Sequence, residues 1–175
     1  MTWKSHTAIA AAITLPFNPA LIPAAALGAT APDWLEWIVK FFGIRVEHRK
    51  ETHYLIIPII IIIISFFMDF RGIIFWFGIG YLTHWVADSL TITGVPIAPY
   101  ARYRIHLLGG KIRTGDITEY IISFSLLLLS FIMFKPNIAT ANNNIFNPYN
   151  MNYKELNKKK IIDNKTMLEN RFKLF

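Results

Sequence analysis

Three long apolar segments constrain the fold of this chain more than any other feature. The first, residues 54–67, has isoleucine at almost every position and contains the unbroken run Ile59–Ile64. The other two cover residues 72–90 and 117–134. A segment that is apolar on every side is typical of a helix in a bilayer, where each backbone group must bond within its own segment. The sequence therefore predicts an all-α, multi-pass membrane helical bundle with three full spans.

The N-terminal region is also apolar, but three prolines interrupt it. Pro16, Pro19 and Pro23 lack a backbone N–H and disfavour helix at the residue before them. We therefore expect two short helices, residues 7–15 and 20–29, that form a re-entrant hairpin rather than a cleaved signal peptide. Both ends of this hairpin would lie on one side of the bilayer. The charged, aromatic segment 33–53 is expected to be a loop along the lipid headgroups.

The composition agrees with a membrane protein and defines the tail. Hydrophobic residues make up 54% of the 175 residues and charged residues 17%, which excludes an ordinary soluble domain and a disordered chain. The formal net charge of +7 is expected to face lipid headgroups, so no nucleic acid partner is predicted. We expect a membrane-embedded domain over residues 1–134. A basic Asn- and Lys-rich tail, disordered or a surface helix, is expected over residues 135–175.

The most informative polar residues are His84 and Asp88, four apart inside an apolar segment. On a helix this spacing places both side chains on one face. An ionisable group buried in a bilayer needs a partner, a metal ion or a water-filled cavity. One interpretation is a metal site, and the other is a plain His–Asp hydrogen bond that tightens helix packing.

Further histidines and acids should reach the same place. His48 and His53 can share a ligand only if the chain bends between them, and a loop that enters a helix at residue 52 or 53 supplies that bend. The hairpin topology brings this loop to the end of the 72–90 segment, together with His6 and Asp33. Because the chain has no cysteine, a metal site must use His and carboxylate groups, which indicates Zn²⁺ with Mn²⁺ as the alternative.

Arginine and glutamate residues near this face suggest a substrate and a proton acceptor. Guanidinium groups pair with phosphate, so Arg49, Arg104 and Arg113 could bind a phosphate-containing substrate, as could the neighbouring Arg102. The alternative is that they touch membrane lipids and set the orientation. Two carboxylates are candidates for the general base or for a supporting partner of the metal ligands: Glu36 and Glu119.

The order of these motifs resembles a known family. His6, the pair at residues 32–33, HRKETH at 48–53, GYLTHWVADSLTITGVP at 80–96 and RTGDITE at 113–119 are similar to the bacterial inner-membrane metal-dependent hydrolases of the YdjM-like group. The resemblance covers roughly residues 5–130 and implies one or two metal ions. The zinc ligands of zinc-dependent phospholipase C are a more distant analogy. The resemblance implies these ligands: His6, Asp33, His48, His53, His84 and Asp88.

The chain departs from the family pattern after Asp33. The family often reads PDID followed by His, whereas this chain reads PDWLEW, so Leu35 replaces a carboxylate and Glu36 stands where a His is usual. A full second metal site would need Glu36 to substitute for that His.

Together these observations predict a membrane-bound metal-dependent hydrolase acting on a phosphoester, such as a phospholipid, through a metal-activated water. The resemblance implies the bacterial inner membrane, and counting basic residues near the span ends predicts a site that faces the cytoplasm. One alternative is a non-catalytic membrane scaffold or regulatory protein whose His/Asp cluster is structural. A small transporter or metal carrier is a weaker one, and no feature of the sequence indicates an oligomeric state.

Overall fold

The fold is all-helical in the part of the chain that the computed structural model describes, which is residues 1–45, 49–68, 72–99, 101, 103–134, 157 and 163–165. Contacts divide the chain into two units, Met1–Phe134 and Lys135–Phe175, and the fold described here is that of the first. Extended structure in the described residues is limited to two isolated bridges, Thr91 with Ile112 and Val95 with Ile105. The helices are α1 (Trp3–Thr14), α2 (Ile22–Phe41), α3 (Ile56–Met68), α4 (Ile73–Ser89) and α5 (Ile117–Met133), with the short 3-10 turns η1 (Pro19–Leu21), η2 (Glu51–His53) and η3 (Leu107–Gly109).

The three apolar segments form helices close to the predicted bounds, as α3, α4 and α5. Gly72 caps the start of α4 with a φ of 76°, a left-handed conformation that glycine adopts at little cost. Asp116 caps α5, because its side chain accepts a hydrogen bond from the Ile117 backbone N–H. No helix among the described residues has both the length and the apolar character required to cross a membrane. The three full spans therefore stay a prediction.

The N-terminal hairpin is present, but its second helix is longer than predicted. α2 continues past residue 29, through Pro32, to Phe41, so the predicted loop 33–53 is wrong over its first nine residues. Pro32 removes only the one hydrogen bond that its N–H would have donated to Gly28, and the other turns of the helix remain intact. Pro23 lies in the first turn of α2, where no N–H donor is needed. Asp33 is therefore held in mid-helix.

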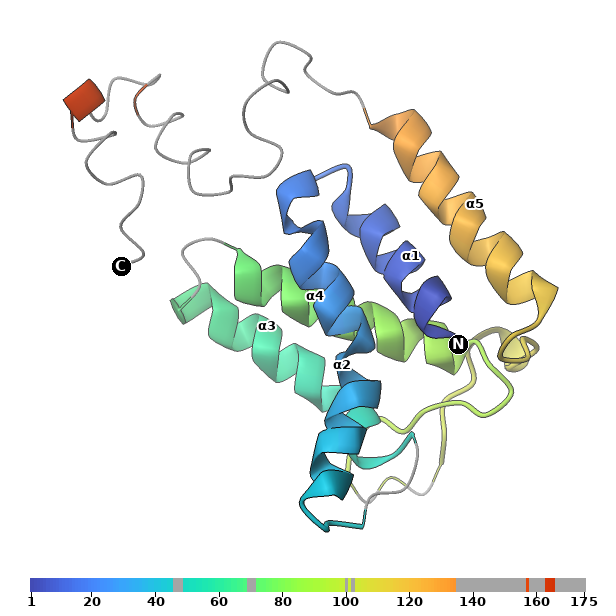
Figure 1. Ribbon diagram of the computed structural model, residues 1–175. Helices are drawn as coiled ribbons and strands as arrows, with labels where there is room; N and C mark the ends of the chain where they lie inside the picture. The colour runs from blue at the N-terminus through green and yellow to red at the C-terminus, as the bar shows by residue number, and fades with distance from the viewer. Residues whose placement is uncertain are drawn as a thin grey trace. The chain divides into compact units, whose positions relative to one another are not determined.

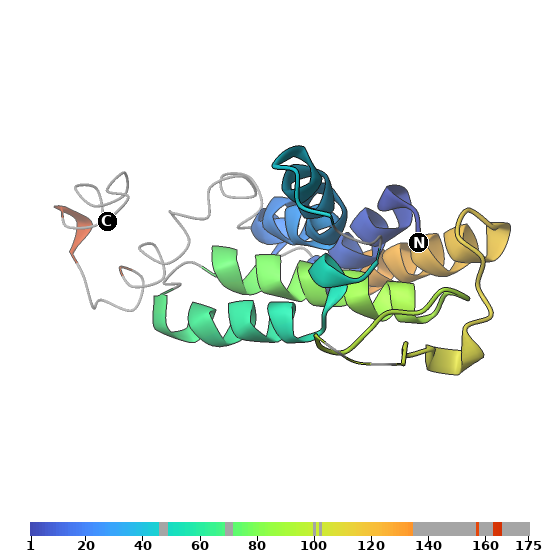
Figure 2. The ribbon, with the colours of Figure 1, turned by 90° about the horizontal axis from the view of Figure 1, so that it is seen from below.

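The helices pack so that one end of the bundle is polar. Figure 1 shows α1 between α2 and α5, while α2 crosses α4. Figure 2, seen from below, shows α3 and α4 side by side with α2 over α4. The start of α1 (residues 3–6), η2, the last turns of α4 and the start of α5 meet at this end, near the N-terminus in Figure 1.

Two glycines allow α2 and α4 to approach closely. A Cβ atom added to Gly28 would overlap the carbonyl oxygen of Phe77, and one added to Gly80 would overlap the carbonyl oxygen of Ala25. Small residues at a crossing let helix backbones come together in this way. The approach brings α2 within hydrogen-bonding distance of His84, because the imidazole Nδ1 lies 2.6 Å from the carbonyl oxygen of Ala29.

Candidate metal centre

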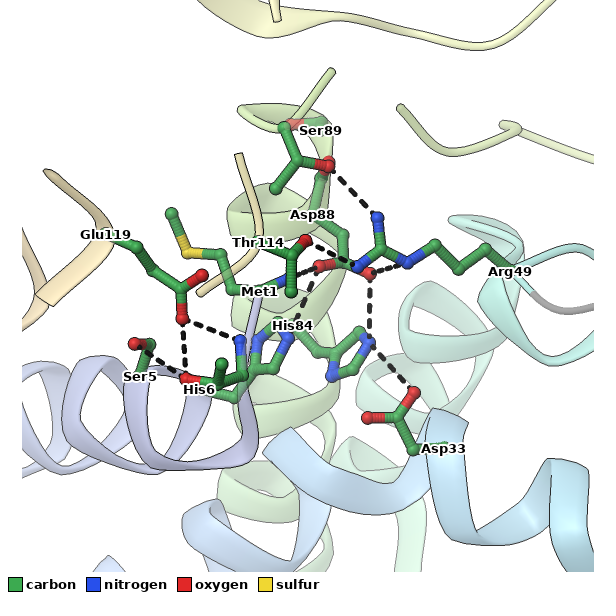
Figure 3. Close-up of polar contacts among 12 residues, drawn as sticks. Met1, Ser5, His6, Asp33, Arg49, His84, Asp88, Ser89, Thr114 and Glu119 are labelled. Atoms are coloured by element: carbon green, nitrogen blue, oxygen red, sulfur yellow. Dashed lines mark hydrogen bonds and ion pairs between the residues drawn. The ribbon is translucent and has the colours of Figure 1, made fainter. Parts of the chain in front are cut away.

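Asp88 lies at the centre of a buried polar cluster near the C-terminal end of α4. Figure 3 shows side chains converging on its carboxylate from α1, α2 and α4 and from the segment that precedes η2. His6, His53, His84 and Asp88 are each 1% exposed. The Asp33 side chain is 16% exposed, so it is the most exposed of the candidate ligands in the described residues.

Four ligand atoms of this cluster form a closed ring. His53 Nε2 is 3.4 Å from Asp33 Oδ1 and 4.0 Å from Asp88 Oδ2. His84 Nε2 is 4.0 Å from Asp33 Oδ1 and 3.5 Å from Asp88 Oδ2. Ligands placed tetrahedrally around Zn²⁺ at about 2.0–2.1 Å are separated by roughly 3.4 Å. Within this ring, the ligand atoms of Asp33, His53 and His84 all lie within 4.8 Å of one another, so these three residues are spaced in a way that suits one such ion.

The His84 imidazole is oriented with its Nε2 atom toward the two carboxylates of the cluster. Its Nδ1 faces the Ala29 carbonyl, an acceptor only, so Nδ1 donates a proton there and Nε2 is the nitrogen that remains to bind a metal ion. That Nε2 atom is buried and has no hydrogen-bond partner of adequate geometry among the described residues. Metal-binding histidines in proteins are commonly oriented by such a backbone carbonyl. A buried imidazole nitrogen in this state fits a metal ligand.

His6 extends the cluster on the other side of Asp88. Its Nε2 is 3.3 Å from Asp88 Oδ1, and its ring stacks on that of His84 with centroids 3.8 Å apart. Two three-residue groups have the spacing of metal ligands, namely His6, His84 and Asp88, and Asp33, His53 and His84. His84 belongs to both, and its Nε2 can bind only one ion. The two groups therefore cannot each hold an ion with all three of their ligands.

Two positive groups also contact Asp88. The amino group of Met1 pairs with Oδ1, and the Nε of Arg49 lies 3.2 Å from Oδ2. The guanidinium also donates to Thr91 Oγ1 at 3.1 Å and to Thr114 Oγ1 at 3.2 Å. Arg49 has a φ of 59°, a left-handed conformation that costs a non-glycine residue energy. The fold thus holds Arg49 against Asp88 despite local strain.

The electrostatic environment keeps Asp33 charged and His53 neutral. Burial raises the pKa of Asp33, but the neighbouring imidazoles of His53 and His84 outweigh it and hold the pKa at about 2. Burial lowers the pKa of His53 below its ordinary value, although Asp33 opposes this effect. A charged carboxylate and a neutral imidazole are the protonation states in which these groups bind a metal ion.

The two glutamates predicted as general bases have other partners. Thr2 donates to Glu119 Oε1 through its N–H and its hydroxyl, each at 2.6 Å, and the Gly115 N–H donates to Oε2 at 2.8 Å. Glu119 therefore ties the start of α5 to the start of α1. Glu36 is buried and accepts from Lys40 Nζ at 2.6 Å, one turn along α2. A catalytic role for Glu36 or Glu119 stays a prediction.

The predicted phosphate-binding arginines differ in position. Arg49 joins the cluster, whereas the Arg104 guanidinium contacts the carbonyl oxygens of Thr93 and Gly94, at 3.4 and 3.5 Å. Arg113 is exposed, and its side chain makes no hydrogen bond or ion pair with another described residue. His48 and Arg102 lie outside the described residues, so their predicted roles stay predictions.

Several groups that hold the cluster residues in place were not predicted from the sequence. Thr91 and Thr114 fix the Arg49 guanidinium, and the Ala29 carbonyl fixes His84. The Tyr81 hydroxyl donates to the carbonyl of Thr52, next to His53. Tyr81 falls in the GYLTHWVADSLT motif one turn before His84, and that spacing is the one signal that could have found it. The contacts of backbone carbonyls and loop threonines produce no such spacing pattern in the sequence.

A separate half-open pocket of about 540 Å³ lies along the segment that carries Arg49 and His53. Its walls include Lys50, Glu51, Tyr54 and Pro96. The indole N–H of Trp85, next to His84 in the sequence, donates to the Pro96 carbonyl at 2.9 Å. The pocket walls are thus connected to neighbours of two cluster histidines, but no cluster residue lines the pocket itself.

Comparison with known proteins places this geometry in a family context. No curated protein and no solved structure matches the chain. Residues 1–144 match the family described as YdjM inner membrane protein, a range that contains every described residue of the cluster. The match confirms the YdjM-like inner-membrane family that the motifs resemble but does not test the hydrolase activity, and the chain belongs to the YdjM inner membrane protein family.

Proposed function

We propose that the protein is a multi-pass inner-membrane hydrolase that uses a metal ion, Zn²⁺ or Mn²⁺, to cleave a phosphoester such as a phospholipid. The observation that carries the proposal is the ring of contacts at 3.4–4.0 Å among Asp33, His53, Asp88 and His84. Four buried or half-buried ligand groups with no thiolate match the ligand preferences of these ions. Membership of an inner-membrane family supports the location.

The donor set fits catalysis as well as binding. Each three-residue group, if it held an ion alone, would leave a coordination position open, as in catalytic zinc sites. A metal ion bound there would supply a water of near-neutral pKa and polarise the phosphoryl oxygen. The chain's own residues would hold the ion through a three-residue group such as Asp33, His53 and His84, with Asp88 and His6 beside them.

Arg49 is the basic residue best placed to act beside the ion. Its guanidinium lies against Asp88 and is fixed by two threonine hydroxyls, so it offers a preorganised positive charge to a phosphate group. We further propose that the site faces the cytoplasm, since basic residues are concentrated in the loops at this end.

The proposal is tested by hydrolysis assays on purified protein loaded with Zn²⁺ or Mn²⁺. The substrates are a phospholipid in detergent micelles and a soluble aryl phosphodiester. We expect activity in the wild type and a loss of at least 100-fold in His84→Ala and Asp88→Ala, because each removes a ligand of the ion. His106→Gln is the matched control, since His106 lies in the exposed loop before η3. Equal activity in all four proteins would overturn the proposal.

A second candidate function is a non-catalytic scaffold. The ion pairs of Asp88 with Arg49 and with the Met1 amino group favour it, because they neutralise this carboxylate without a metal. In that case Asp88→Asn would lower stability, while the wild-type protein would bind no stoichiometric metal. Elemental analysis of the wild type separates the two candidates.

A further inference from the structure

Asp33 is the most exposed of the candidate metal ligands among the described residues. His6, His53, His84 and Asp88 are each 1% exposed, whereas the Asp33 side chain is 16% exposed. Its Oδ1 faces His53 and His84, so Oδ2 points to the outer side of the cluster. A substrate group that approaches the cluster from this side would pass next to this oxygen.

Two tryptophans lie next to the exposed side of Asp33. The indole N–H of Trp3 donates to Asp33 Oδ2 at 2.7 Å. The Trp3 ring also packs against that of Trp37, with centroids 5.2 Å apart and the planes tilted by 36°. Trp37 stands one helical turn after Asp33 on α2, on the same face. Both rings are open to the outside, with 43% of Trp3 and 62% of Trp37 exposed.

The surface around the pair has the composition of a lipid headgroup contact. The exposed residues Ile38, Phe41 and Phe42 continue it along the last turn of α2. Lysines border it, because Lys4 follows Trp3 and is exposed, and the Lys40 side chain is 45% exposed. Exposed indoles with lysines are typical of the membrane interface, where the ring meets the acyl boundary and the ammonium meets phosphate.

We propose that the Trp3–Trp37 pair and the exposed end of α2 form a lipid-headgroup surface through which a phospholipid phosphate reaches Asp33. The surface belongs to an inner-membrane protein, and this favours a lipid over a second protein as the occupant. The choice of a phospholipid as the group that enters rests on the proposed hydrolase function. The contact of the tryptophans with lipid does not rest on the hydrolase function, because this contact needs neither a metal ion nor substrate turnover.

The test uses tryptophan fluorescence of the full chain in phosphatidylcholine vesicles that contain lipids brominated near the headgroup end of the acyl chain. Bromine quenches indoles that lie at that depth. Trp3→Phe and Trp37→Phe should each lose part of the lipid-quenched emission. Trp85→Phe is the matched control, since Trp85 is 7% exposed, and it should lose only unquenched emission. The Trp37 side chain makes no hydrogen bond with another described residue, so its replacement keeps the test valid if Trp3→Phe does not fold.

Two outcomes would overturn the inference. In the first, the emission lost in Trp37→Phe is quenched by acrylamide from the water phase and not by brominated lipid. In the second, Trp37→Cys forms a disulfide between two copies of the chain. The sequence contains no cysteine, so such a disulfide could form only through the introduced residue. Lipid quenching in a protein that hydrolyses no phosphoester would instead contradict the proposed function alone.

Discussion

The arrangement around Asp88 depends on a few residues that each connect distant segments. Arg49 is the clearest case, because one guanidinium contacts Asp88 on α4, Thr91 after it and Thr114 before α5. A lysine has a single ammonium group and cannot make these three contacts in one plane. The cluster geometry therefore depends on the identity of residue 49 as arginine.

We predict that Arg49→Lys lowers Zn²⁺ affinity by about 10–100-fold, because it removes a group that orients a metal-binding carboxylate. Competition with a chromogenic chelator measures the affinity. Arg104→Lys is the control, since Arg104 contacts two backbone carbonyls outside the cluster, those of Thr93 and Gly94. The Zn²⁺ affinity of this variant should equal that of the wild type. An unchanged affinity in Arg49→Lys would show that this arginine does not support the site.

At the residue scale, the sequence predicted the cluster through spacing. The i, i+4 relation of His84 and Asp88 is sufficient to place both on one face of a helix, and the structure brings them to 3.5 Å. The partner of Glu36 is Lys40, an i, i+4 pair that was missed because residues 33–41 were expected to be a loop and not a helix. The partner of Glu119 could not be predicted, because Thr2 lies far away in the sequence and no local pattern connects the two residues.

At the scale of elements, the close crossing of α2 and α4 positions His84 against Ala29. Gly80→Ala should destabilise the protein by about 1–3 kcal/mol, because the new Cβ overlaps a backbone oxygen of α2 that cannot move aside easily. Thermal unfolding in detergent measures the loss. Gly78→Ala on the same helix is the control, since the atoms nearest to its new Cβ are side-chain atoms of Ile62 and Ile61. This substitution should reduce the free energy of unfolding by less than Gly80→Ala does. Equal losses would argue against a special role for this crossing.

The length of α2 illustrates why sequence reasoning failed at this scale. Pro32 and the charges after it predict the end of a helix, yet tertiary packing retains the helix to Phe41. Packing against α4 and η2 outweighs the local preference, and no local pattern reports that packing. The bounds of the apolar helices were easier to predict, since their composition and the glycine at residue 72 define where they begin and end.

At the scale of the whole molecule, a metal ion held by Asp33, His53 and His84 would join α2, η2 and α4 at one point. A ligand that binds only the folded state stabilises it, by about 2.7 kcal/mol at 100 times the dissociation constant. Treating the protein with a chelator should therefore lower the unfolding temperature by about 5–10 °C, and Zn²⁺ should restore it. The Asp33→Asn, His84→Gln double variant should show neither effect. A chelator-insensitive wild type would contradict a metal that bridges the helices.

The central claim is that the cluster of Asp33, His53, His84 and Asp88 binds metal. Elemental analysis of protein purified without added metal tests it most directly, with the His84→Gln and Asp88→Asn variants and the His106→Gln control prepared in parallel. The account predicts one or two equivalents of zinc or manganese in the wild type and in the control, and far less in the two cluster variants. Metal-free wild-type protein that stays metal-free after incubation with Zn²⁺ or Mn²⁺ would contradict it.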